Sequence, residues 1–157
     1  MGSLIVKGLV VEAADWNQDK ADLIKLRGIV FVEEQNVPVT LEIDGMDPDC
    51  RHVKAVMNDQ TIGTARLLPN GYIGRMCVLK EFRSQGVGKK MLECLIQQAF
   101  YDQKTSAPID EVTLNSQSSA IAFYQANGFV ICSEEFIEAN IVHQKMVLKR
   151  SDYDNRD

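Results

Sequence analysis

The sequence has few cysteines, no long apolar run and no basic excess, and these absences exclude several classes of protein. Its four cysteines, Cys50, Cys77, Cys94 and Cys132, lie far apart without a CxxC pair. This spacing argues against a disulfide framework or metal site, so four reduced thiols are expected. No apolar run approaches the roughly 20 residues of a membrane span, and residues 1–16 lack the regions of a signal peptide. We therefore expect a cytoplasmic protein without a membrane partner.

The charge balance excludes a general nucleic-acid partner. The chain has 17 Lys and Arg against 22 Asp and Glu, a net charge of −5, whereas nucleic-acid binding needs a basic face. The charge leaves room for a basic substrate. The two histidines, His52 and His143, lie far apart with no third ligand in view. Asp44, Asp47 and Asp49 miss the EF-hand spacing, so no metal is expected.

Length and periodicity predict one α/β domain. The 157 residues are 45% hydrophobic and 25% charged, which suits a single soluble domain with a real core. We assign 1–150 to the domain and 151–157 to a polar tail that is expected to fray. Strands are expected at 4–13, 53–58, 60–68, 72–79, 110–115, 129–133 and 142–149, helices at 16–31, 91–100 and 118–127, and a loop at 36–49. This order predicts a mixed α/β sheet that contains an antiparallel meander.

Two residue pairs predict tight turns within the meander. Asn70-Gly71 is the stronger signal, because a type I′ turn needs positive φ at both central positions. Asn58-Asp59 predicts a second tight turn between the strands at 53–58 and 60–68.

The stretch EFRSQGVGKKMLECLI (81–96) joins two glycines to two lysines and an amphipathic helix. Free N–H groups and the dipole at a helix N-terminus attract anions. Gly86 and Gly88 would let the backbone approach a phosphate, with Lys89 and Lys90 as counter-charges. The stretch therefore predicts a phosphate-binding turn.

Two common phosphate motifs do not fit this turn. A Walker A loop would need glycine in place of Arg83 and Ser or Thr in place of Lys90. A Rossmann turn would need a third glycine in place of Met91, and a parallel crossover. The remaining pattern, Arg83-x-x-Gly86-x-Gly88, is also compatible with an ordinary glycine-rich start of a helix.

A downstream segment, LNSQSSAIAFYQANGFV (114–130), favours the phosphate interpretation. Together with the glycine turn it resembles the GNAT superfamily of acetyl-CoA-dependent acetyltransferases, over about residues 4–149. The segments LRGIVFVEEQNVPVTLEIDGMDPDCRH (26–52) and EEFIEANIVHQKM (134–146) are similar to the ElaA-like (YjcF-like) branch. The resemblance implies the GNAT-type acyl-CoA N-acyltransferase fold, acetyl-CoA as donor and an amine as acceptor.

The resemblance also implies a set of cofactor-binding residues. The turn would hold the coenzyme A pyrophosphate, and the preceding strand would pair with the pantetheine arm and polarise the thioester carbonyl through the Val78 N–H. The implied residues are Met76, Cys77, Val78, Arg83, Ser84, Gln85, Gly86, Val87, Gly88, Lys89, Lys90, Asn115 and Tyr124. The side chains at 76–78 could equally be strand core, and Asn115 an ordinary turn residue.

Tyr124 is the implied partner of the leaving thiolate. A free tyrosine titrates near 10 and a thiol near 8.5, so full proton transfer is uphill by about 2 kcal/mol. A hydrogen bond that tightens as charge builds on sulfur is therefore the favoured role. Phe123 and Tyr124 could instead be a packing face. Cys77 could pose as a nucleophile, but without an assigned base a buried strand cysteine is favoured.

Deprotonation of the acceptor needs a base. A lysine-like amine needs roughly 4.6 kcal/mol to lose its proton at pH 7, which a carboxylate or histidine acting through water would reduce. The candidates are Glu33, Glu34 and His143, with His52 weaker. A solvated helix end and a structural histidine are the alternatives.

Residues 29–50 hold six acids and no Lys or Arg: Glu33, Glu34, Glu42, Asp44, Asp47 and Asp49. This segment would favour a cationic acceptor by electrostatic focusing, or it could be a solvated loop.

The sequence thus predicts an N-acetyltransferase that works by direct attack in a ternary complex. The acceptor would be a small cationic metabolite or a lysine or N-terminal amine. A catalytically inactive coenzyme A sensor and an interaction module with a purely structural turn stay open. So do the acceptor, the acyl chain and the choice between a monomer and a homodimer.

Overall fold

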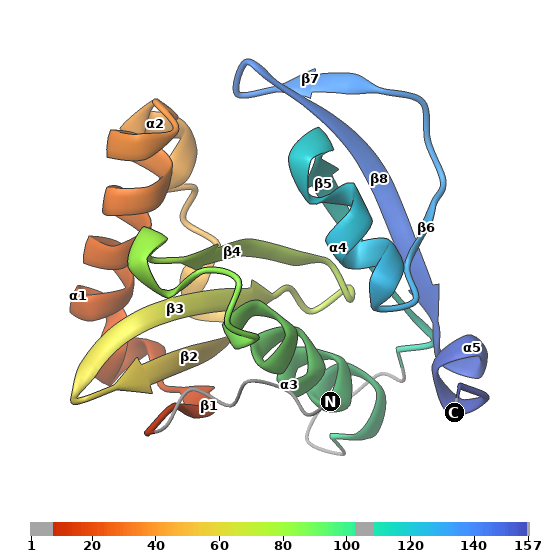
Figure 1. Ribbon diagram of the computed structural model, residues 1–157, viewed down its shortest axis with the longest axis horizontal. Coiled ribbons are helices and arrows are strands. Elements are labelled where there is room, and N and C mark those ends of the chain that lie inside the picture. The colour runs from red at the N-terminus through yellow and green to blue at the C-terminus, as the bar shows by residue number, and fades with distance from the viewer. Residues whose placement is uncertain (1–7, 103–108, 157) are drawn as a thin grey trace.

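The computed structural model describes residues 8–102 and 109–156 and arranges them in two sheets with helices around them (Figure 1). The strands are β1 (Val10–Ala14), β2 (Arg51–Met57), β3 (Gln60–Leu67), β4 (Ile73–Val78), β5 (Glu111–Gln117), β6 (Val130–Ile131), β7 (Phe136–Glu138) and β8 (Ile141–Lys149). The helices are α1 (Trp16–Arg27), which continues as a π-helical segment (Gly28–Glu34), then α2 (Val39–Glu42), α3 (Val87–Tyr101), α4 (Ile121–Ala126) and α5 (Arg150–Asp154). Short 3-10 turns cover Asp47–Asp49, Lys80–Phe82 and Ser118–Ala120. The mixed α/β fold is confirmed; residues 4–7 of the first expected strand lie outside the described residues.

The first sheet is the predicted antiparallel meander, in the order β1-β2-β3-β4. Asn58 and Asp59 turn between β2 and β3 with φ of 50° and 63°, the type I′ geometry. The hairpin at Asn70-Gly71 is confirmed, but its predicted turn type is wrong. Only Gly71 of that pair has positive φ, 92°, and its N–H donates to the Leu68 carbonyl at 3.0 Å. Pro69 and Asn70 therefore form a type I turn that a left-handed glycine completes.

The second sheet has the order β5-β8-β6, with β7 paired to β8. The two sheets meet where β4 and β5 begin, through a parallel bridge between Tyr72 and Thr113 and a hydrogen bond from the Thr113 N–H to the Gly71 carbonyl at 3.1 Å. Beyond this point β4 pairs with β3 and β5 with β8. The two parallel strands therefore diverge toward their C-terminal ends, and we call the opening between them the splay.

The helices cover both faces of the first sheet. β3 is buried along nearly its whole length, which requires cover on both sides. The predicted apolar face of α3 is confirmed: Met91, Leu92, Leu95 and Ile96 are fully buried. On the other side α1 buries Leu23 and Leu26. None of the helices in the described ranges is long and apolar enough to cross a membrane.

Two local expectations need correction. Residues 36–49 are not a plain loop, since they contain α2 and a 3-10 turn. Nor is the start of the tail frayed, because α5 occupies Arg150–Asp154 and buries Tyr153. The Tyr153 hydroxyl accepts from Gln97 Nε2 at 2.6 Å and donates to Glu93 at 3.0 Å. Tyr153, together with the ion pair between Arg156 and Glu93 at 2.7 Å, therefore docks the segment against α3.

Candidate active site

The loop between β4 and α3 exposes backbone N–H groups. Ser84 and Gly86 both have left-handed backbones, with φ of 63° and 84°, and Gly86 caps α3. The Lys90 N–H donates to the Gly86 carbonyl at 3.2 Å. Helical bonding therefore starts at Lys90, and the N–H groups of the preceding turn have no carbonyl one turn earlier to bind. Val87 is buried and anchors the loop on the core.

The glycine loop has the features of an anion-binding turn. A Cβ added at Gly86 would meet nothing within 4 Å, so the space before the loop is open, while φ itself favours glycine. A Cβ at Gly88 would touch the ring of Phe123 at 3.4 Å. Lys89 and Lys90 are exposed beside the loop. Free N–H groups, the dipole of α3 and two lysines together favour negative charge here.

Arg83 and Glu34 form an ion pair. Arg83 Nη1 and Nη2 donate to the two carboxylate oxygens of Glu34 at 2.6 and 2.8 Å, and its Nε donates to the Val78 carbonyl at 2.8 Å. The hydrogen bonds from Arg83 lower the pKa of Glu34. Arg83, expected to face a phosphate, is thus occupied by a residue expected to be a base.

The next residue, Gln35, reaches the other side of the splay. Gln117 Nε2, at the end of β5, donates to Gln35 Oε1 at 2.9 Å. Consecutive residues at the end of the π-helical segment therefore bind the loop after β4 and the end of β5, and we call Glu34 and Gln35 the strap. Neither Gln35 nor Gln117 was predicted from the sequence. The adjacent residues Glu34 and Gln35 indicate this arrangement only once their partners, Arg83 and Gln117, are known.

A bulge in β4 turns its backbone toward the splay. Arg75 has φ of 51°, and the register shifts there, because Thr64 faces Cys77 while Arg66 faces Gly74. The Leu79 N–H donates to the Ile62 carbonyl at 2.8 Å. Since bonded and non-bonded pairs alternate along an antiparallel ladder, the backbone groups of Val78 face away from β3, toward β5.

Cys77 is a core residue, as favoured from the sequence. Its side chain is buried, and burial raises the pKa of its thiol to about 12. The thiolate form is therefore scarce at neutral pH, and Cys77 is unsuited to nucleophilic catalysis.

Tyr124 lies on α4 and points at β4. Its hydroxyl is 3.6 Å from Met76 Sδ, and its ring contacts Phe123 and Phe129 edge-on. Burial, and then the charge of Tyr72, raises the pKa of Tyr124 to about 12. At neutral pH the group is a hydrogen-bond donor whose partner in the described chain is a weakly accepting thioether.

Asn115 is engaged across the second sheet. Its Nδ2 donates to Glu138 Oε2 on β7 at 3.2 Å. Burial, and then the charge of Glu138, raises the pKa of Tyr72. The predicted contact of Asn115 with the cofactor stays a prediction.

His143 is held by the backbone. Its Nδ1 is 2.7 Å from the Ile141 carbonyl and its ring stacks on Phe136. Because a carbonyl only accepts, Nδ1 carries the proton, and in the neutral ring Nε2 has a lone pair. His52 is buried as well, with Nε2 donating to the Asp47 carbonyl at 2.9 Å, which is a structural role.

The acidic segment does not present the negative patch expected of it, because arginines from elsewhere neutralise it. Arg27 contacts both Glu42 and Asp47, the latter at 2.7 Å. Arg66 binds Asp44 and Asp47, and Arg75 binds Asp44 at 3.2 Å. The hydrogen bond from Arg66 holds the pKa of Asp44 well below its usual range. With Glu34 also paired, the segment no longer supports focusing of a cationic acceptor; Glu33 and Asp49 are exposed.

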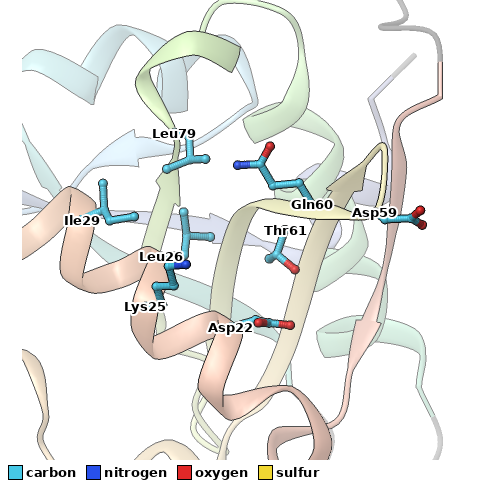
Figure 2. A pocket seen from close by; sticks show the side chains of 8 residues that line it. All are labelled: Asp22, Lys25, Leu26, Ile29, Asp59, Gln60, Thr61 and Leu79. Carbon is cyan, nitrogen blue, oxygen red and sulfur yellow. The ribbon is translucent and has the colours of Figure 1, made fainter.

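Two surface hollows lie away from these groups. One of about 250 Å³ lies between α1 and the start of β3; Figure 2 shows Asp22, Lys25, Leu26 and Ile29 on one side, Asp59, Gln60 and Thr61 on the other, and Leu79 beside them. Another of about 570 Å³ is lined by α5 and the ends of β5 and β8. Neither is lined by the glycine loop or Tyr124, so neither hollow belongs to the candidate site.

Comparison with known proteins gives one consistent result. Residues 21–150 match the model of the acetyltransferase (GNAT) domain family. The chain is 37% identical over 130 residues to the uncharacterized N-acetyltransferase YjcF of Bacillus subtilis, covering 80% of this chain and 89% of YjcF. The crystal structure of Escherichia coli ElaA superposes with a TM-score of 0.78 at 29% identity, covering 89% of this chain and 99% of ElaA. An acyl-CoA N-acyltransferase from Pseudomonas aeruginosa gives a TM-score of 0.75 at 30% identity over 88% and 98% of the two chains.

Proposed function

This chain belongs to the GNAT acetyltransferase family, and from that membership we propose that it transfers the acetyl group of acetyl-CoA to an amine. One observation carries the proposal. The open glycine loop follows β4 after the short turn Lys80–Phe82, and the Tyr124 hydroxyl lies 3.6 Å from Met76 of β4. An anion cradle thus lies beyond the C-terminal end of β4 and a hydrogen-bond donor contacts the strand itself, which suits a ligand that carries both phosphate groups and a thioester.

The residues divide the chemistry among them. The N–H groups of the loop, with Lys89 and Lys90, hold the pyrophosphate, and the Val78 N–H faces the thioester carbonyl. The amine nitrogen attacks that carbonyl, the C–N bond forms and the C–S bond breaks. Full proton transfer from Tyr124, with its pKa of about 12, to the leaving thiolate, whose thiol has a pKa near 8.5, would cost about 5 kcal/mol. Tyr124 therefore donates a hydrogen bond to the departing thiolate.

The ammonium must first lose a proton. Among the candidate bases, Glu34 is weakened because Arg83 lowers its pKa and occupies both its oxygens. Glu33 is exposed at the same end of the π-helical segment, and His143 has a lone pair on Nε2. We assign the proton to one of these two, acting through water, and give Glu34 a positioning role in the strap.

The test is release of free coenzyme A from acetyl-CoA in the presence of a panel of primary amines, with products identified by mass spectrometry. The Tyr124→Phe variant should lose about 100-fold in kcat and keep its melting temperature. Tyr153→Phe, a buried tyrosine on α5, is the matched control and should keep kcat. Acetyl-CoA binding without turnover of any amine would instead favour a coenzyme A sensor.

A further inference from the structure

The segment from Val39 to Met46 turns its acids inward and its apolar side chains outward. Glu42 and Asp44 are bound to arginines. Four apolar side chains are between 47% and 55% exposed, and we call them the apolar ridge: Val39, Leu41, Ile43 and Met46. Such a cluster on a soluble domain marks a contact surface. Its four members lie within eight consecutive residues, which isolated exposed hydrophobic residues do not.

Arg75 fixes the ridge beside the proposed reaction site. Its Nη2 donates to the carbonyls of Leu41 at 3.1 Å and Glu42 at 3.0 Å. The residue that follows Arg75 is Met76, which contacts the Tyr124 hydroxyl. The backbone of the ridge is therefore bound by the β4 residue that precedes Met76.

Strand β7 also carries an exposed apolar side chain. Ile137 is 66% exposed there, and the neighbouring Glu138 accepts from Asn115 on β5 at 3.2 Å. Figure 1 shows α2 and β7 at the same end of the molecule, one beside each sheet. The ridge and β7 therefore both carry exposed apolar side chains, and β7 adds one carboxylate that can attract an ammonium group.

We propose that the acceptor is a primary amine with an apolar body, which lies along the apolar ridge while its ammonium group faces the splay between β4 and β5. The assignment rests on the proposed acetyl transfer and names its substrate class. A polyamine is disfavoured because Glu42, Asp44 and Asp47 are already bound to arginines. A second ammonium group would have to lose its water against apolar side chains, without an unpaired carboxylate among those three.

The test compares hexylamine with 1,6-diaminohexane, which have the same chain length and differ by an ammonium group at the far end. The parent protein should show a kcat/KM for hexylamine that exceeds that of the diamine by about tenfold, the effect of burying roughly two methylenes. Leu41→Asp should bring the ratio close to one. Val130→Asp, at an equally exposed valine on β6, is the control and should keep the parent ratio.

Several outcomes would overturn the assignment. A preference for the diamine, an equal response of both variants, or turnover of neither amine by a protein that binds acetyl-CoA would each do so. Sedimentation of the parent and of Leu41→Asp should show monomers; a dimer that the substitution dissociates would assign the ridge to a second copy. If acetyl-CoA did not raise the melting temperature of the parent, the proposed function itself would be contradicted.

Discussion

The glycine loop, 83–90, and the acidic segment, 29–50, carry the clearest basic and acidic signals in the sequence, but their environments in the fold differ. The loop acts through its own backbone, since the left-handed Gly86 and the start of α3 expose N–H groups whatever surrounds them. The acidic segment acts through side chains, and Arg27, Arg66 and Arg75 decide what those side chains face. Backbone geometry is therefore local and readable from a motif, whereas net charge is not readable until the partners are known.

The largest expected effect comes from breaking the acidic segment's internal pairing. Arg27→Ala should destabilise the fold by about 3–5 kcal/mol, because it removes the nearer of the two arginines paired with the buried Glu42 and leaves only Arg75, at 3.5 Å. Urea unfolding measures the loss. Lys25→Ala, an exposed cation on the same helix, should stay within about 0.5 kcal/mol of the parent. Equal effects would mean that the cluster is ordinary surface charge.

The pH dependence of stability sharpens the same contrast. The hydrogen bond from Arg66 lowers the pKa of Asp44 in the folded protein, so its contribution is complete above the unfolded value of about 3.9. It is lost as pH falls through the folded value. The free energy of unfolding should therefore decline below about pH 4, and less steeply in Asp44→Asn. Parallel curves for parent and variant would contradict this.

The smallest expected effect is at Glu34, where the two regions touch. If Glu34 belongs to the strap, Glu34→Gln should change kcat less than about threefold and stability by at most about 1 kcal/mol, since the pair is partly exposed. The pH profile of kcat/KM should also keep its acid limb. A loss of about 100-fold in kcat, accompanied by disappearance of the acid limb, would make Glu34 the general base. Glu33→Gln in the same assay provides the comparison.

Most of the architecture was predictable because it depends on neighbours in the sequence. The apolar face of α3, the meander and both hairpins follow from periodicity and turn residues. The turn type at Asn70-Gly71 was not predicted. With Pro69 and Asn70 at the centre of the turn, Gly71 alone of that pair takes a left-handed backbone. In the tail, fraying was expected from the polar composition, but Tyr153 is buried and Arg156 pairs with Glu93.

The candidate site divides along the same line. Gly86 and Tyr124 stand in local motifs; Gly86 caps α3, and the Tyr124 hydroxyl contacts Met76 of β4. The pairing of Arg83 with Glu34, and of Gln117 with Gln35, joins residues far apart in the chain. No periodicity links such residues, so their association could be found only in the fold.

The central claim is that the glycine loop holds coenzyme A, and thermal melting with excess acetyl-CoA tests it most directly. At about 100 times its dissociation constant the ligand should stabilise the parent by about 2.7 kcal/mol, and Gly86→Glu should abolish that shift. Gly45→Glu is the matched control, because Gly45 also has positive φ, 77°, and open space at its Cβ; it should keep the shift. A shift that survives Gly86→Glu, or no shift in the parent, would contradict the account.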